Sequence, residues 1–279
     1  GGDGTRELTT PLPKGWLSTF YGTVIGALGY SIAYPAWPML TSATPGLLGY
    51  SSRAQLEEQV GEAKAAQKAS LDKSAASSVD DILKDENLLA FARAGGAAAF
   101  KVNCVQCHGA GAAGGVGYPN LNDDDWLWGG TPEAIYTTLK NGIRYTSNAE
   151  TRDSQMPAFG ADGILNAEQI GQVASYVVSL SGEQADQAAV QAGQQVFAEN
   201  CASCHGGDAR GGRDFGAPNL TDKIWLYGAT LETVKAQIPK PRHGVMPAWS
   251  HRLDDATVKE LAVYVHTLGG GEAAEAITQ

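Results

Sequence analysis

The chain has 279 residues, a length that predicts about two domains. It carries 20 basic and 30 acidic residues, a net charge of −10, which argues against a nucleic-acid partner and favours a basic docking partner. All four cysteines belong to two copies of one short motif, so none is left for a structural disulfide.

The N-terminal part of the chain predicts a membrane anchor at 14–40, preceded by a polar segment at 1–13. No charged residue occurs from 15 to 52. As a helix, Trp16 to Tyr34 would span about 28 Å, close to one hydrocarbon core. A buried soluble helix is the alternative, and a signal peptide fits less well because the apolar run is too long.

Basic residues before the anchor set its expected orientation. Arg6 and Lys14 precede the apolar run, so the positive-inside rule puts 1–13 in the cytoplasm and the rest of the chain in the periplasm. After the anchor, 41–87 is rich in Ala, Glu, Lys and Gln with a thin apolar stripe, and predicts a helical spacer without visible chemistry.

Each of the two cysteine motifs has the form Cys-x-x-Cys-His, the attachment signature of a c-type haem. They consist of Cys104, Cys107 and His108, and of Cys201, Cys204 and His205. Two thiols three residues apart lie on one helical turn and can bond the two vinyl groups of a porphyrin, while the histidine ligates the iron. We therefore expect two covalently bound haem c groups.

Zinc and redox dithiols are the alternatives for paired cysteines. The two motifs begin 97 residues apart, at 104 and 201. A zinc ribbon needs its pairs about 15–20 residues apart, and no strand–helix alternation of a dithiol oxidoreductase surrounds either copy.

Around these motifs the chain repeats itself, which predicts an all-α fold with two tandem class I-like cytochrome c domains at 88–182 and 183–279. Gly96-x-x-x-Phe100 before the first motif matches Gly193-x-x-x-Phe197 before the second. The last helix of each repeat has the same apolar stripe, with Tyr176 matched by Tyr264. The predicted helix N-caps are Thr131, Asn166, Thr230 and Asp254.

Met156 and Met246 are the candidate sixth ligands of the two irons. Both stand in a Met-Pro-Ala-aromatic sequence before the last helix of a repeat. Thioether ligation favours ferrous iron and leaves no open site for oxygen, so electron transfer is expected rather than catalysis at these irons. His243, His251 and His266 are less favoured alternatives. The sequence leaves open whether each methionine serves its own repeat or whether His243 replaces one.

Together these features resemble the dihaem subunit, called CcoP or FixP, of cbb3-type cytochrome c oxidases. Besides the haem motifs, the resemblance rests on short segments along nearly the whole chain: Asp3-Gly4, Pro11-Leu12-Pro13-Lys14-Gly15-Trp16, Tyr34-Pro35 and Asp125-Trp126-Leu127-Trp128-Gly129-Gly130. It implies that the carbonyls of Pro119 and Pro218 accept the proximal histidine N–H groups. It also implies that Trp126 and Trp225 border the haems, at a propionate or at the haem edge.

The resemblance further implies a function. The chain would be a non-catalytic subunit that accepts electrons from a donor cytochrome c. It would pass them through a monohaem cytochrome c subunit to the haem–copper catalytic subunit, in the bacterial inner membrane. A dihaem carrier that links other membrane complexes, a dihaem peroxidase and, more remotely, a zinc-binding membrane protein are the alternatives.

Overall fold

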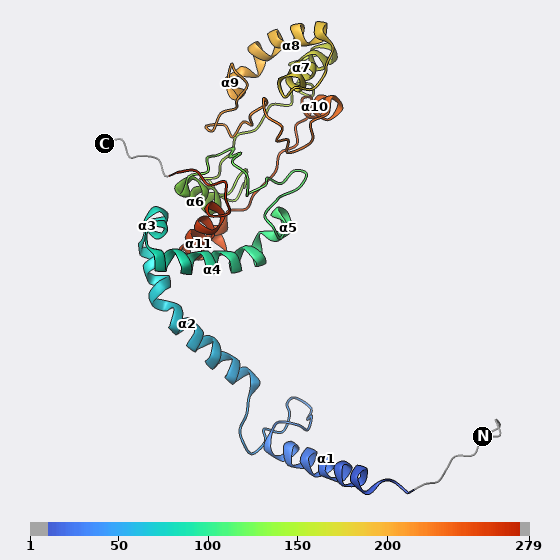
Figure 1. Ribbon diagram of the computed structural model, residues 1–279, viewed down its shortest axis with the longest axis vertical. Coiled ribbons are helices and arrows are strands. Elements are labelled where there is room, and N and C mark those ends of the chain that lie inside the picture. Colours follow the sequence, from blue (N-terminus) through green and yellow to red (C-terminus); the bar gives the residue numbers. More distant parts are fainter. Residues whose placement is uncertain (1–10, 274–279) are drawn as a thin grey trace, which may run out of the picture. The chain divides into compact units, whose positions relative to one another are not determined.

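The computed structural model describes residues 11–273 and is helical (Figure 1). The predictions that involve Asp3-Gly4, Arg6, most of segment 1–13 and the end of the last domain lie outside these residues. In the described part there are isolated β-bridges but no strands. The helices are α1 Lys14–Ala33, α2 Ser52–Ala76, α3 Val79–Lys84, α4 Glu86–Asn103, α5 Val105–His108, α6 Pro132–Asn141, α7 Ala167–Leu180, α8 Gln187–Asn200, α9 Ala202–His205, α10 Leu231–Gln237, the 3₁₀ helix η1 Trp249–His251 and α11 Asp255–His266.

The chain divides into two compact units, 1–69 and 70–279. In the first unit, α1 begins after Pro13 and ends before Tyr34, and none of its residues is buried. Across 11–273, no helix reaches the combination of length and mean hydropathy that a membrane span requires. The anchor at 14–40 therefore stays a prediction.

The helices of the second unit begin where their capping residues predict. Thr131 accepts a hydrogen bond from Ala134 N at 3.3 Å, and Asp254 accepts one from Thr257 N at 2.9 Å. Asn166 forms a full capping box with Gln169. Thr230 caps α10 in the same way. These side chains satisfy backbone N–H groups that have no partner within the helix, which fixes where each helix starts.

The helices pair across the boundary that the repeat predicts at 182/183. α11, from the second repeat, packs against α4, α6 and α3, which come from the first repeat and the segment before it. α7, from the first repeat, packs instead against α8 and α10 of the second (Figure 1). The link at 181–186 is short, and short links favour packing of successive helices as neighbours.

Glycine allows close approach at both of these helix crossings. A Cβ added at Gly96 of α4 would come 2.6 Å from Tyr264 Cβ of α11, and the same change at Gly193 of α8 would bring it 2.9 Å from Tyr176 Cβ of α7. Neither glycine can therefore be replaced without moving a helix. Each glycine meets the tyrosine of the other repeat.

The same two tyrosines also contact the phenylalanines of the helices that lead into the haem motifs. Tyr264 lies 5.4 Å from Phe100, centroid to centroid, and Tyr176 lies 5.3 Å from Phe197. Each aromatic pair thus joins the two repeats, one at α4 and α11 and the other at α7 and α8.

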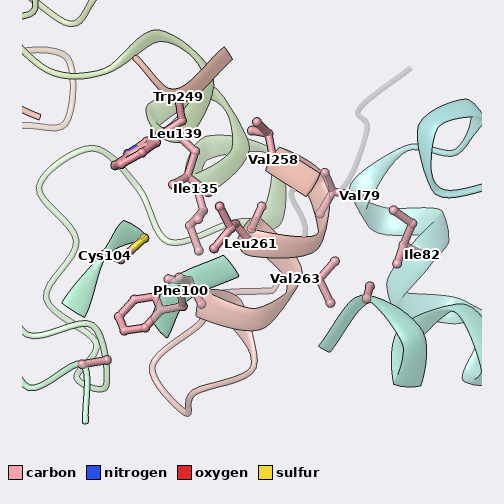
Figure 2. Close-up of a cluster of buried hydrophobic side chains, with 14 of the residues drawn as sticks. Val79, Ile82, Phe100, Cys104, Ile135, Leu139, Trp249, Val258, Leu261 and Val263 are labelled. Carbon is pink, nitrogen blue, oxygen red and sulfur yellow. The ribbon is translucent and has the colours of Figure 1, made fainter. Parts of the chain in front are cut away.

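Two separate hydrophobic clusters result. The first contains Cys104 and joins α3, α4 and α6 to η1 and α11. Figure 2 shows the Cys104 side chain beside Phe100, with Ile135 of α6 and Leu261 of α11 next to them. The second cluster joins α7 and α8 to α10 and includes Phe159 and Phe197. Each cluster is built from segments of both repeats.

Candidate haem sites

Both haem motifs fold as a short helical turn directly after a longer helix. Cys104 ends α4, and the N–H groups of Cys107 and His108 bond its carbonyl at 3.1 and 2.9 Å. Cys201 ends α8 in the same way, with distances of 3.2 and 3.0 Å to Cys204 and His205. Each pair of thiols is therefore held on one turn with the histidine next to it, the arrangement that thioether attachment requires.

Each motif histidine is oriented by a proline carbonyl. His108 Nδ1 lies 3.1 Å from Pro119 O, and His205 Nδ1 lies 3.1 Å from Pro218 O. Donation from Nδ1 leaves Nε2 free as the nitrogen that binds iron. Burial lowers the pKa of both histidines, and the proline carbonyl opposes that shift. Both rings are therefore neutral near pH 7, as a metal ligand must be.

The first cysteine of each motif lies in an apolar setting. Burial, and to a smaller extent the neighbouring thiol, raises the pKa of Cys104 and of Cys201 to about 11. Such thiols stay protonated at neutral pH, whereas a zinc site or a reactive dithiol needs a stabilised thiolate. The environment fits uncharged thioether sulfur, and the residues present fit haem c.

The two candidate methionines lie at crossed positions. Met246 packs against the first hydrophobic cluster, which contains Cys104. Met156 packs against the second cluster, against which Cys201 also packs. Each methionine thus shares a core with the haem motif of the other repeat, because the chain segment between α6 and α7 leads Met156 away from α4.

The two methionine loops, here residues 142–159 and 243–249, run against each other. Ile143 N bonds Met246 O at 2.9 Å, and Met246 N bonds Ile143 O at 3.0 Å. Gly142 makes this approach possible, since an added Cβ would lie 2.5 Å from Met246 O. Backbone hydrogen bonds to Ile143 of the first repeat therefore fix the position of Met246.

The three alternative histidines have other partners. Burial, and then the charge of Arg144, lowers the pKa of His243, and the nearby Met156 backbone opposes this shift. His251 lies on Tyr145, with ring centroids 6.3 Å apart. His266 Nε2 lies 2.7 Å from Glu272 O. His243 is the one that lies at a methionine loop.

The two tryptophans border the clusters as packing residues. Trp126 packs against the first cluster, and its Nε1 donates to Gly270 O at 2.7 Å. Trp225 packs against the second cluster. For Trp126, the indole N–H is thus engaged by a backbone carbonyl, which favours the packing role over a propionate contact.

Sequence reasoning missed the arginines around the methionine loops. Arg152 stacks on Trp128, with 5.2 Å from its Cζ to the ring centroid, and its Nε is buried without a hydrogen-bond partner. Arg242 stacks on Tyr227 at 4.5 Å. Arg152 and Arg242 precede Met156 and Met246 by the same four residues, a match between the repeats that could have identified them.

Comparisons of this sequence with known protein families support the assignment of two haem c sites. A family model described as "Cytochrome C oxidase, cbb3-type, subunit III" matches residues 91–177 and 188–265. A second, "N-terminal domain of cytochrome oxidase-cbb3, FixP", matches 3–41. The "Cbb3-type cytochrome c oxidase subunit FixP" of Sinorhizobium medicae is 57% identical over 270 residues, 97% of this chain and 93% of its own length.

Other relatives cover the chain equally well. The subunit CcoP of Cereibacter sphaeroides is 53% identical over 271 residues, and the subunit FixP of Bradyrhizobium diazoefficiens is 49% identical over 271, each across 97% of this chain and 93% of the relative. Two haem motifs, two matched cytochrome regions and this near full-length identity lead to one conclusion. The chain belongs to the FixP/CcoP family, the dihaem c-type electron-transfer subunits of cbb3-type cytochrome c oxidases.

Proposed function

We propose that this chain passes electrons from a donor cytochrome c towards the haem–copper catalytic subunit of its oxidase, and that each of its two haems would be held by the histidine of one repeat and the methionine of the other, an arrangement called crossed ligation here. In this arrangement Met246 and His108 would hold the first haem, and Met156 and His205 would hold the second. The observation that carries the proposal is the position of each methionine against the hydrophobic cluster of the other repeat's haem motif.

The chain's own residues account for the transfer role. When bound, the haems supply one-electron redox chemistry. The carbonyls of Pro119 and Pro218 keep each histidine in one tautomer, and the two methionines pack, partly buried, against the apolar clusters. One methionine thioether and one histidine imidazole would hold each iron and leave it no open site for oxygen, so the bound haems would serve electron transfer.

Crossed ligation can be tested with one haem at a time. In the full chain carrying Cys201→Ala and Cys204→Ala, only the first haem is attached. We expect Met246→Leu in this background to abolish the red-edge charge-transfer band of methionine-ligated ferric haem, and Met156→Leu to leave the band intact. The reverse result would show that each repeat ligates its own haem.

Membrane anchoring through α1 is part of the same proposal. Large apolar side chains on α1 are exposed, among them Phe20, Ile25 and Leu28. The helix also contains hydroxyl residues, but Thr23 Oγ1 bonds Phe20 O at 2.8 Å and Ser31 Oγ bonds Ala27 O at 2.8 Å. Such internal bonds lower the cost of placing a hydroxyl in lipid.

Fractionation tests the anchor and its orientation. Membranes that contain the full chain should retain it after alkaline carbonate washing, while a chain without 14–33 should be released. With the haem domains in the periplasm, protease added to intact spheroplasts should remove the haem stain. Protection of the stain would reverse the proposed orientation.

Native purification tests the assembly. In mild detergent, we expect b-type haem, copper, a monohaem cytochrome c subunit and oxygen uptake to co-purify with the two covalent haems of this chain. A chain that elutes alone with its two haems would instead support the alternative of a carrier between other membrane complexes.

A further inference from the structure

Arg144 lies where the two methionine loops meet. Its Nε donates to Gly244 O at 2.7 Å, and its Nη1 donates to Ser154 O at 2.9 Å. Gly244 stands two residues before Met246, and Ser154 stands two residues before Met156. One planar guanidinium thus bridges carbonyls at the same position of both loops, which are about 90 residues apart in sequence.

The backbone of Arg144 is committed to this bridge. Its N–H bonds Arg152 O at 2.8 Å, and its φ is +51°, in the left-handed region that a residue with a side chain rarely adopts. Such a conformation is unfavourable and persists only when the surrounding contacts over-determine it. Here those contacts are the backbone hydrogen bonds between the preceding residue, Ile143, and Met246, and the bonds from the Arg144 side chain to the two carbonyls.

A second contact joins the two loops. Met246 of the second loop exchanges backbone hydrogen bonds with Ile143 of the first. His243, next to Gly244, lies near the backbone of Met156. Each methionine therefore lies beside a residue of the other loop.

The charge of Arg144 is not paired in a salt bridge within residues 11–273. Its side chain is half-buried, and the Asp153 carboxylate acts on it electrostatically without a salt-bridge contact. A guanidinium near both iron ligands opposes the extra positive charge of ferric iron, so it favours the reduced state of each haem. The position and the charge of Arg144 therefore affect both haem sites.

We propose that Arg144 is a positioning residue shared by the two haem sites, which holds both methionine loops so that the two thioethers stay on their irons together. This inference rests on the proposed crossed ligation for the identity of each haem's ligand. The bridge itself rests on the two carbonyl bonds, whichever methionine serves which haem.

The test uses the full chain with both haems attached, in detergent. Arg144→Ala removes bridge and charge, Arg144→Lys keeps the charge without the planar fork, and Arg93→Ala removes an equal charge from the exposed face of α4. The readouts are the methionine–iron charge-transfer band and the two reduction potentials from a spectroelectrochemical titration.

We expect Arg144→Ala to remove more than half of the band and to lower both potentials. Arg144→Lys should lose a similar share of the band with a smaller fall in the potentials, and Arg93→Ala should leave the band and both potentials as in the parent chain. A change confined to one haem, no change, or full retention of the band in Arg144→Lys would overturn the shared role.

Two further variants keep the outcome readable. If Arg144→Ala does not incorporate haem, Arg144→Gln can bridge only one of the carbonyls and takes its place, with the same expectation. Single Met156→Leu and Met246→Leu chains should each lose about half of the band. If either loses none, the proposed ligation fails, and this result is separate from any effect of Arg144.

Discussion

The Trp128 indole lies directly against the backbone of Gly216, so that a Cβ added at Gly216 would overlap the ring. The matching pair in the other direction is Tyr227 and Gly117, where an added Cβ would lie 3.3 Å from the tyrosine Cε1. In each pair the glycine belongs to the loop after one haem motif and the aromatic ring to the other repeat.

This relationship joins the two haem sites by equivalent contacts. Arg152 also lies over the ring of Trp128, as Arg242 lies over the ring of Tyr227. Gly117 N also bonds Leu226 O at 2.8 Å. These contacts hold the loop after each haem motif against an aromatic residue of the other repeat.

Gly216→Ala should therefore destabilise the protein. Gly216 has a φ of +58°, so alanine adds backbone strain to its overlap with Trp128. We expect a loss of about 1–3 kcal/mol in the free energy of unfolding, measured by denaturant titration of the haem-loaded chain. Gly207→Ala is the matched control, since nothing lies within 4 Å of its added Cβ. Equal stability of the two variants would contradict the packing argument.

The sequence predicted the parts of both sites but not their pairing. Cys-x-x-Cys-His needs only local helical geometry, and the helix caps need only the next three residues, so both follow from short segments. Gly96 and Gly193 are each typical of a close helix crossing, but Tyr176 and Tyr264 occupy the same position in the last helix of each repeat. Either tyrosine could therefore pack on either glycine, and only the three-dimensional packing decides which pair forms.

The role of Arg144 was invisible for a different reason. The first repeat has more residues between α6 and its methionine than the second repeat has after α10, so Arg144 has no counterpart in the repeat. Its partners are carbonyl oxygens, which every residue has, and carbonyl partners leave no sequence signature. A site made by a side chain on backbone atoms is found only in the structure.

Cutting the link between α7 and α8 should leave the two parts of the chain associated. With a protease site inserted after Gly182, both hydrophobic clusters still hold segments from each side of the cut. We expect the two fragments to elute together from a size-exclusion column, with their haem spectra unchanged. Two independently migrating haem domains would show that the repeats pack separately.

A chain that ends at residue 182 is the complementary experiment. It keeps α4 but lacks α11, so Phe100 loses its contact with Tyr264 and the first cluster loses Leu261. We expect such a chain to be degraded rapidly, or to bind its haem without the methionine–iron band. A stable chain with a full band would mean that Met156 can serve the first haem.

Glu260 should make stability depend on pH. Its side chain is 4% exposed and lies against Gly95, and burial, then the charge of Asp254, raises its pKa to about 7. The unfolded carboxyl ionises near pH 4.5, so its contribution is full below that pH and lost as pH rises to about 7.

Glu260→Gln removes this titration and introduces the residue that the first repeat has at the matching position, Gln172. We expect the variant to be more stable than the parent by roughly 1–3 kcal/mol at pH 8, with a smaller difference at pH 5. Denaturant titrations at the two pH values measure it. A pH-independent difference would indicate that Glu260 is ionised in the folded protein throughout this range.

Reduction by a basic donor cytochrome c should slow as salt increases. The chain carries a net charge of −10, and three consecutive acidic residues, Asp123, Asp124 and Asp125, follow the first haem motif in the sequence. Opposite charges raise the encounter rate, and added salt screens them beyond a Debye length of about 10 Å at 0.1 M.

Stopped-flow reduction over a range of ionic strength measures this effect. We expect the parent chain to lose at least several-fold in rate between low and high salt, and Asp124→Asn to be slower at low salt but equal at high salt. Asp72→Asn serves as the control, because this substitution removes the same charge from α2. A rate independent of salt would mean that apolar contacts, not charge, bring the donor to the haem.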